Sequence, residues 1–274
     1  MLDDKLSNIE PLARGGQKEV YHAIHTDFGR VAYKVIKSGS DIFERTKREI
    51  RAVSLLDHPN IPKIYDHNCD QNNGDLFIVE EFIEGKTLRK ILSDGKRFVI
   101  NEITEFLDVM LDIAVLAESK SLVHRDIKPE NIMIDADNKI WLLDFGIARH
   151  LDLESLTQTD EPFGLFTLGY ASSEQFRNFK KEIDIRADLF SIGVVVHEML
   201  TGLNFYRKDT NDPLMILKRI EKFSLPPLRI EGDVQFQLST FIRMIGDYRR
   251  TRRPRNAKEA LDIYNSVKTT LRNI

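Results

Sequence analysis

The sequence predicts an α+β protein of two lobes, a small antiparallel sheet with one helix followed by a larger, mainly helical part. Up to about residue 80, short runs of β-branched and aromatic residues alternate with turn residues, which is typical of strands. After Gly85 the apolar residues recur at spacings of three and four, which is typical of helices. We therefore expect an N-terminal lobe over about 1–82, a C-terminal lobe over about 83–274 and a cleft between them.

The N-terminal lobe is expected to hold strands on both sides of one helix. Residues 31–36 and 76–79 are rich in β-branched and aromatic side chains, which favours strands. Between them, residues 42–56 place single apolar side chains among charges, as an amphipathic helix does. The Pro59-Asn60 pair follows this helix and ends it, because proline cannot continue the helical hydrogen bonds.

Three helices are expected in the C-terminal lobe. Asn101 is a suitable N-cap for a helix whose apolar stripe continues to Ala117. Residues 189–200 are apolar on almost all sides, which indicates a helix buried in a core. Apolar residues recur at steps of three or four from Leu261 to Ile274, so a final amphipathic helix is expected to pack against the body.

Composition excludes several classes of protein. The 274 residues include 40 basic and 43 acidic ones, and this net charge of −3 argues against a nucleic-acid partner, which requires a basic face. The one cysteine, Cys69, cannot form an intramolecular disulfide. No apolar run approaches the length of a membrane-spanning helix, and the first residues lack the pattern of a secretory signal. We expect a cytoplasmic protein with no membrane segment in this chain.

Two short motifs carry the chemistry. The first is HRDIKPEN at 124–131, and the second is DFG at 144–146, whose Asp144 follows Asp126 by 18 residues. On its own, a DFG triplet is more often only a tight turn. Both motifs in this order and at this spacing resemble the eukaryotic-type (Hanks-type) protein kinases, specifically their bacterial serine/threonine members. The resemblance covers the chain from about residue 9 to about 270.

The resemblance implies a single protein kinase domain over 1–274 that transfers the γ-phosphate of ATP to serine or threonine hydroxyls of protein substrates. In the family, the residue matching Asp126 accepts the proton of the substrate hydroxyl, and the one matching Lys128 lies near the γ-phosphate. Asn131 and Asp144 match the ligands of Mg²⁺ or Mn²⁺, and their hard oxygen atoms suit such cations.

The nucleotide-binding residues of the family lie upstream. Lys34 matches the strand lysine that holds the α- and β-phosphates, and Glu49 matches the helix glutamate that pairs with it. A single lysine or glutamate is normally a solvated charge, so these two matches depend on the downstream motifs. The positions that match the family's nucleotide contacts are Leu12, Ala13, Gly15, Gly16, Val20, Ala32, Lys34, Glu81, Ile83 and Met133.

The sequence departs from the family at two points. Ala13 and Lys18 replace the first and third glycines of the glycine-rich loop, and we expect Lys18 to be a solvated turn residue. Glu80 stands at the gatekeeper position, where the family usually has an apolar or small residue, unless the alignment slips by one. We expect its carboxylate to point behind the adenine, within reach of Lys34, and to compete with Glu49 for that lysine.

Further matches imply structural roles. Glu174 corresponds to the glutamate that pairs with a basic residue near the C-terminus, here Arg253, and Asp188 to the buried aspartate that anchors the catalytic loop. The basic run at 249–253 is therefore interpreted as a solvated face with one buried ion pair.

Arg125 marks the kinases that are controlled by phosphorylation of the activation segment. By this resemblance we expect autophosphorylation at Thr157 or Thr159, in a homodimer whose copies phosphorylate each other. Thr167 matches a residue that hydrogen-bonds the catalytic aspartate and lysine and is expected to act unphosphorylated.

Two other functions compete with this interpretation. A catalytically dead relative that acts as a binding module would lack a catalytic residue, and its support here is the imperfect glycine loop. A small-molecule phosphotransferase of the aminoglycoside type typically has glycine after the catalytic histidine and no Lys-Pro-Glu run. This chain has Arg125 and the run at 128–130 instead.

Overall fold

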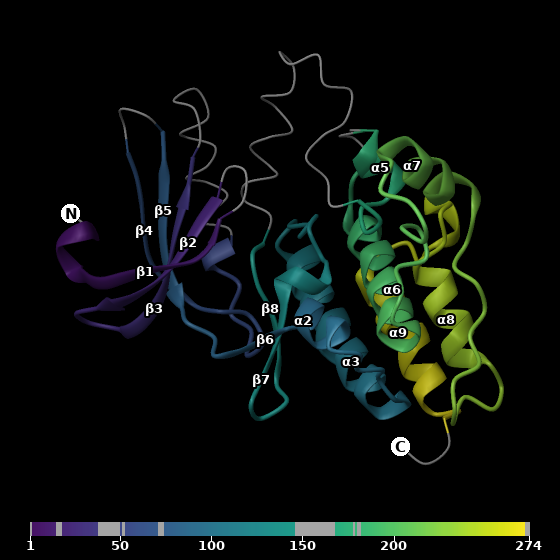
Figure 1. Ribbon diagram of the computed structural model, residues 1–274. Coiled ribbons are helices and arrows are strands. Elements are labelled where there is room, and N and C mark those ends of the chain that lie inside the picture. Colours follow the sequence, from purple (N-terminus) through teal and green to yellow (C-terminus); the bar gives the residue numbers. More distant parts are fainter. Residues whose placement is uncertain are drawn as a thin grey trace.

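A computed structural model describes residues 2–14, 18–37, 50, 53–70, 74–145, 168–177, 179 and 182–271. A sheet occupies one side of the molecule and a group of helices the other, with a small second sheet between them (Figure 1). This arrangement is the α+β, two-lobed one that the sequence predicts. Residues 82–84 connect the two sides. That the lobes divide at residue 82, and that the whole chain is a single domain, stay predictions.

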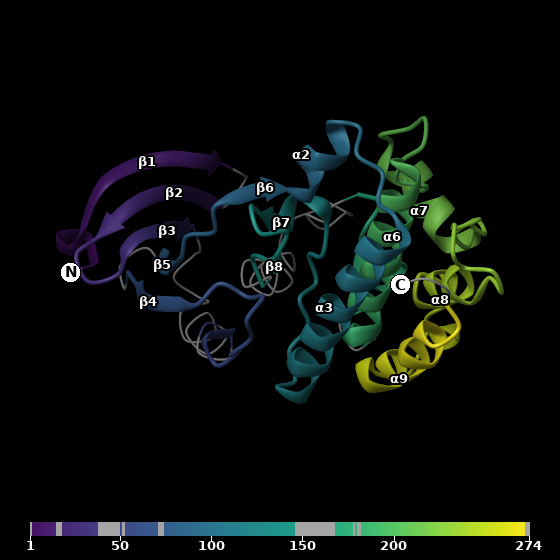
Figure 2. The ribbon, with the colours of Figure 1, turned by 90° about the horizontal axis from the view of Figure 1, so that it is seen from below.

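The larger sheet is antiparallel and follows a short 3-10 helix, η1 (Leu2–Lys5). Its strand order is β1-β2-β3-β5-β4, and the strands curve together when seen from below (Figure 2). The strands predicted at 31–36 and 76–79 are confirmed as parts of β3 and β5. The strands are β1 (Leu6–Arg14), β2 (Lys18–His25), β3 (Gly29–Ile36), β4 (Ile64–Cys69) and β5 (Leu76–Glu81).

The register of the strands separates the two faces of this sheet. Val20 pairs with Lys34, and Ala32 pairs with Glu80. Because residues directly opposite each other share a face and alternate residues return to it, Lys18 lies on this face as well. The other face carries a separate buried cluster, whose members are Ala23, Val31, Tyr33 and Val79. The sheet therefore presents two lysines and a glutamate on one side.

Only the end of the predicted helix over 42–56 falls within the described residues. Ile50, Val53 and Ser54 are helical. Ile50 is fully buried against Ile36, Leu76 and Ile78 of the sheet, so the helix packs on the face that carries the lysines.

The small sheet joins the two sides of the molecule. It consists of β6 (Gly85–Thr87), β7 (Ile132–Asp135) and β8 (Ile140–Leu142), paired antiparallel in that order. A Cβ atom at Gly85 would lie 2.5 Å from the carbonyl oxygen of Ile134, so this close approach of β6 to β7 requires glycine. A 3-10 turn, η3 (Pro129–Asn131), leads directly into β7.

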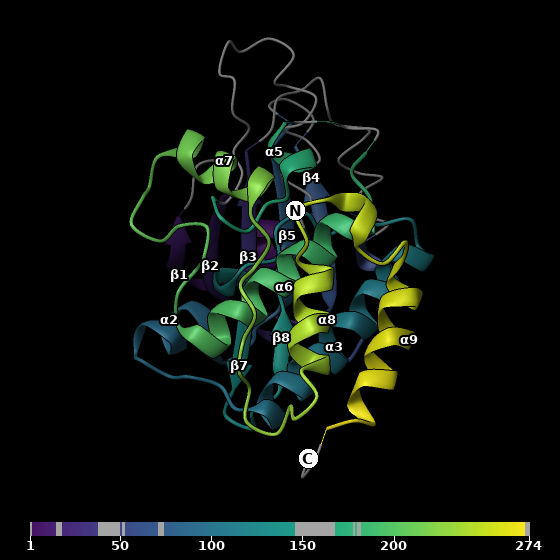
Figure 3. The same ribbon diagram turned by 90° about the vertical axis from the view of Figure 1, so that its right-hand side faces the viewer.

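Helix α6 is the centre of the helical side. It is buried along almost its whole length, as its all-round apolar sequence predicts. Helix α8 lies along it, whereas α9 packs mainly against α3 and α8 (Figure 3). A Cβ at Gly193 of α6 would lie 2.7 Å from the backbone nitrogen of Gly246, just after α8. The described helices are α2 (Leu88–Ser93), α3 (Ile100–Ser119), α5 (Ser173–Phe176), α6 (Ile185–Thr201), α7 (Pro213–Lys222), α8 (Gln237–Ile245), η4 (Arg250–Arg252) and α9 (Ala257–Lys268).

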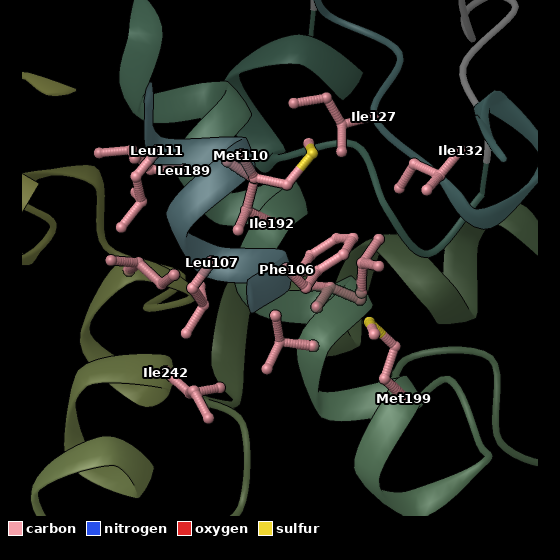
Figure 4. Close-up of a cluster of buried hydrophobic side chains, with 14 of the residues drawn as sticks. Phe106, Leu107, Met110, Leu111, Ile127, Ile132, Leu189, Ile192, Met199 and Ile242 are labelled. Carbon is pink, nitrogen blue, oxygen red and sulfur yellow. The ribbon is translucent and has the colours of Figure 1, made fainter. Parts of the chain in front are cut away.

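The main core lies between α3, α6 and α8. Phe106 and Leu107 of α3 are fully buried near Leu189 of α6 and Ile242 of α8 (Figure 4). Burying a side chain of this size contributes about 1.5–3 kcal/mol. The same cluster extends to Ile127, within the HRDIKPEN segment, so the core packs directly against that segment. None of the described helices is both long and apolar enough to cross a bilayer.

Two predicted helix ends are wrong. Helix α3 begins at Ile100 with Val99 as its N-cap, not Asn101. The Glu102 carboxylate accepts a hydrogen bond from the Val99 N–H at 2.9 Å, which satisfies that end of the helix before the asparagine is reached. Helix α9 ends at Lys268, so Leu271 follows the helix, and Ile274 lies outside the described residues.

Glu174 and Arg253 form the predicted buried ion pair. Their side chains are 3% and 0% exposed, with 2.6 Å between Oε1 of Glu174 and Nη1 of Arg253. Arg253 also donates to the carbonyl oxygens of Asp247, Tyr248 and Arg186, so its remaining N–H groups have acceptors. The neighbouring arginines of the basic run are more exposed and pair with other carboxylates, which confirms the interpretation of 249–253 as a solvated face with one buried pair.

Glu174→Ala is expected to lower the free energy of unfolding by about 3–5 kcal/mol, because it leaves the Arg253 charge buried without its carboxylate. Asp262→Ala is the matched control, since it removes a carboxylate that pairs with Lys258 on the exposed face of α9. That change should cost less than about 1 kcal/mol. Urea unfolding measures both, and equal losses would contradict the role of the buried pair.

Candidate active site

Asp188 in the first turn of α6 holds the backbone of the HRDIKPEN segment. Its carboxylate accepts hydrogen bonds from the N–H groups of His124 at 2.7 Å and Arg125 at 2.8 Å. Burial raises the pKa of Asp188 to about 6, and the two N–H donors oppose that shift. Arg125 has a φ of 64°, a left-handed conformation that costs free energy in a residue other than glycine. The predicted anchoring role of Asp188 is confirmed.

Gln175 of α5 provides a second tie to this segment. Its amide nitrogen donates to the carbonyl oxygen of Arg125 at 2.9 Å, while its amide oxygen accepts from the Ser172 N–H at 3.2 Å. The sequence analysis missed this residue. The available signal was the spacing of a capping box, a glutamine three residues after a serine at a helix start.

The three predicted residues of the first motif lie together. The Lys128 ammonium is 3.0 Å from Oδ2 of Asp126. The Asn131 amide nitrogen donates to the same oxygen at 2.9 Å and to the Asp126 carbonyl at 2.9 Å. The 3-10 turn at 129–131 produces this convergence, because it folds Asn131 back over Asp126.

Contacts of the residues next to Asp144 place it beside Asp126 and Asn131. The Leu143 N–H donates to the Asn131 carbonyl at 2.8 Å, and the Leu143 carbonyl lies 2.9 Å from Nε2 of His124. The Phe145 ring packs on the His124 ring, with 4.7 Å between centroids. Asp144 itself has a φ of 59°, a left-handed conformation, and its carboxylate faces the large sheet, where it pairs with Lys34.

A cluster of four charges joins the sheet to this segment. The Lys34 ammonium lies 2.6 Å from Oδ1 of Asp144 and also pairs with Glu80. Lys18 pairs with the other carboxylate oxygen, Oδ2 of Asp144. The Lys34 side chain is only 6% exposed and that of Glu80 only 11%. Two ammonium groups and two carboxylates therefore neutralise one another at the junction of the lobes.

The pKa values in this cluster follow from burial and from the opposite charges. Burial alone would raise the pKa of Asp144, but the ammonium groups of Lys18 and Lys34 hold it well below its usual range. Burial lowers the pKa of Lys34, but Asp144 and Glu80 outweigh it and leave the pKa above its usual value. For Glu80, burial is stronger than the attraction of Lys34 and raises the pKa. Lys34 is therefore a permanent cation here.

The structure confirms one prediction about this cluster and overturns another. Glu80 points to Lys34, as expected of a carboxylate at its position. Lys18 is not a solvated turn residue: it opens β2, on the same face as Lys34, and so reaches Asp144. The predictions for Glu49 fall outside the described part of the chain, as do those for Gly15, Gly16, Gly146, Thr157, Thr159 and Thr167.

The remaining predicted nucleotide contacts lie on the large sheet, in the connection that follows it or on the small sheet. Ala32 is buried and Val20 half-buried, on neighbouring strands. Met133 lies on β7, and Glu81 and Ile83 lie where the chain passes from β5 to β6. Leu12 and Ala13 are exposed at the end of β1.

The donor set suits a hard divalent cation that is also bound by phosphate oxygens. The amide nitrogen of Asn131 is committed to Asp126, so its oxygen is the atom left for a cation. Each carboxylate oxygen of Asp144 already attracts an ammonium group. Over the described ranges no cluster of three or more His, Cys, Asp or Glu side chains could hold a metal alone. Mg²⁺ commonly binds in this way, through one or two protein oxygens and a polyphosphate.

Residues 6–263 match the family described as the protein kinase domain. This chain belongs to that family. A probable serine/threonine-protein kinase of Clostridium acetobutylicum is 33% identical over 279 residues, which cover 100% of this chain and 41% of that relative. Serine/threonine-protein kinase PknL of Mycobacterium tuberculosis is 36% identical over 207 residues, which cover 74% of this chain and 50% of that relative. The kinase domain thus spans half or less of the length of these relatives.

A solved structure has the same fold. A point mutant of the kinase domain of Mycobacterium tuberculosis PknI superposes with a TM-score of 0.69 over 96% of each chain. At 19% identity this likeness shows the fold alone, and it confirms the predicted two-lobed kinase fold.

Arg89 of α2 ties four parts of the kinase domain together. Its guanidinium bonds Glu130 at 2.7 Å and Glu198 of α6 at 2.7 Å. It also donates to the Tyr170 hydroxyl, which donates in turn to Glu198. The sequence analysis missed this network, because its members are far apart in the chain and each alone is an ordinary charged or aromatic residue. The network fixes Glu130, within the HRDIKPEN motif, relative to α2 and α6.

Glu80→Gln is expected to lower the Kd for ATP by about three- to tenfold, because the carboxylate that shares Lys34 would also repel a polyphosphate nearby. Adenosine, which lacks phosphates, should bind equally to both proteins. Isothermal titration calorimetry with ATP and with adenosine measures the Kd of each ligand for both proteins.

Glu84→Gln is the matched control, since it removes a carboxylate of the adjacent connection that pairs with Arg30 at the surface. An unchanged ATP affinity in Glu80→Gln would show that Glu80 does not compete for Lys34.

Proposed function

We propose that this kinase domain transfers the γ-phosphate of ATP to serine or threonine hydroxyls of protein substrates. The observation that carries the proposal is the meeting of two groups, Asp126 with Lys128 and Asp144 with Lys34, joined through Asn131. Phosphoryl transfer needs positioned charges on both sides of the transferred group more than it needs covalent chemistry.

On the substrate side, Asp126 accepts the proton of the attacking hydroxyl and orients it. Lys128, whose ammonium lies 3.0 Å from Asp126, neutralises charge on the γ-phosphate. Asn131 and Asp144 would hold Mg²⁺ or Mn²⁺, which neutralises the phosphate oxygens when bound.

On the nucleotide side, Lys34 binds the α- and β-phosphates and Glu49 orients it. The backbone of Glu81 and Ile83 binds the adenine edge. The adenine ring packs between apolar side chains above and below it. The contact residues proposed for ATP are Leu12, Ala13, Gly15, Gly16, Val20, Ala32, Lys34, Glu81, Ile83 and Met133.

The rival functions make different predictions. A dead binding module should lack one of the acidic or basic residues just named, and the chain carries them all. Incubation with radiolabelled ATP and Mg²⁺ separates the three cases. Label on protein supports the kinase, label on an added aminoglycoside supports the small-molecule phosphotransferase, and no turnover supports the binding module.

We also infer a cytoplasmic location, where ATP is available.

Asp126→Asn is expected to lower turnover by about 10²–10⁴-fold, because an amide cannot accept the hydroxyl proton. Asp144→Asn should abolish most metal-dependent turnover, because an amide lacks the charge that Mg²⁺ requires. Steady-state phosphorylation of a generic protein substrate at saturating Mg²⁺ and ATP measures both. Near-normal turnover in either variant would refute the assignment.

Autophosphorylation at Thr157 or Thr159 is expected to raise turnover. A phosphate there adds a charge of about −1.5 to −2, which can pair with Arg125 and order the segment. Mass spectrometry after incubation with Mg²⁺-ATP locates the phosphate, and mixing active protein with Asp126→Asn protein tests transfer between copies of a homodimer. Phosphate found only outside 144–174, with full activity in the double-alanine protein, would exclude this mechanism.

A further inference from the structure

Two lysines converge on Asp144 from neighbouring strands. Lys34 on β3 takes Oδ1 and Lys18 on β2 takes Oδ2. Lys18 pairs in register with Ile36, two residues beyond Lys34, so both side chains leave the same face of the sheet. Lys18 stands in the third glycine position of the glycine-rich loop motif.

We propose that Lys18 is a second phosphate-binding lysine, which exchanges Asp144 for the polyphosphate of ATP when nucleotide and metal bind. The inference rests on the proposed function, since it places ATP phosphates beside Asp144. It adds to that function a binding residue in a position where the family motif has glycine.

The charges of the cluster explain the exchange. The formal charges of Lys18, Lys34, Glu80 and Asp144 sum to zero. A divalent cation on Asp144 repels both ammonium groups from that carboxylate, while metal-bound ATP still carries net negative charge. The phosphates are then the nearest anions to which a displaced ammonium can move.

Lys18 is held less firmly at Asp144 than Lys34 is, so it moves to the phosphates more readily. Lys34 keeps a second carboxylate, Glu80, when the metal displaces it from Asp144. Asp144 is the one carboxylate in direct contact with Lys18 in the part of the chain that the structure describes. The Lys18 side chain is also 30% exposed, against 6% for Lys34, so its ammonium has room to move.

Isothermal titration with Mg²⁺-ATP and with adenosine tests the proposal on four proteins, the natural chain, Lys18→Met, Lys18→Arg and Lys37→Met. We expect Lys18→Met to bind ATP about tenfold or more weakly, because a charge-assisted hydrogen bond is lost. Adenosine should bind it normally, and Lys18→Arg should restore most ATP affinity. Lys37→Met removes the same charge just after β3, where Lys37 contacts Glu19, and should leave both affinities unchanged.

Titration of the nucleotide-free proteins with Mn²⁺, followed by electron paramagnetic resonance, gives a second readout. Lys18→Met should bind Mn²⁺ more tightly than the natural chain, because the ammonium that competes for Asp144 is gone. Lys18→Gln serves the same purpose if the methionine variant does not fold.

Equal ATP affinity in the natural chain and Lys18→Met, or an equal loss of ATP and adenosine binding, would overturn the proposal. Either result leaves the proposed function intact so long as the natural chain phosphorylates protein. Failure of the natural chain to bind ATP at all would instead refute the proposed function.

Discussion

The hydrogen bonds from the backbone of His124 and Arg125 to Asp188 are the contacts on which the site depends. They connect a loop with strained backbone to a helix that is buried on nearly all sides. The same helix holds the segment after residue 168, because the Ser191 hydroxyl donates to the Tyr170 carbonyl at 2.8 Å. Apolar burial of α6 therefore stabilises polar geometry that could not persist alone.

The large sheet meets this scaffold through charge. Lys34 is buried and cationic, which would be costly without carboxylates on both sides of it. Glu80 comes from the sheet and Asp144 from the helical side, so the pairing of Lys34 links the lobes at the place where a nucleotide is proposed to bind. Both carboxylates thus stabilise this junction.

The sequence analysis predicted what depends on local pattern or on motif register. Asp188 and Glu80 were placed correctly because their positions follow from neighbouring motif residues. Lys18, Arg89 and Gln175 were missed or misjudged, since their roles depend on partners 126, 109 and 50 residues away in the chain. Single-residue patterns carry no information on such distant partners, whereas strand register and helix packing determine them.

The close approach at Gly193 has a consequence for how this kinase domain tolerates change. The space between α6 and the end of α8 has no room for a methyl group, because the Gly246 backbone fills it. Asp188 lies five residues earlier on the same helix, about 7.5 Å along its axis. A side chain at position 193 would push α6 away from the Gly246 backbone. It would thereby shift Asp188, which holds the backbone next to Asp126. Packing between α6 and α8 thus constrains the geometry of the distant HRDIKPEN segment.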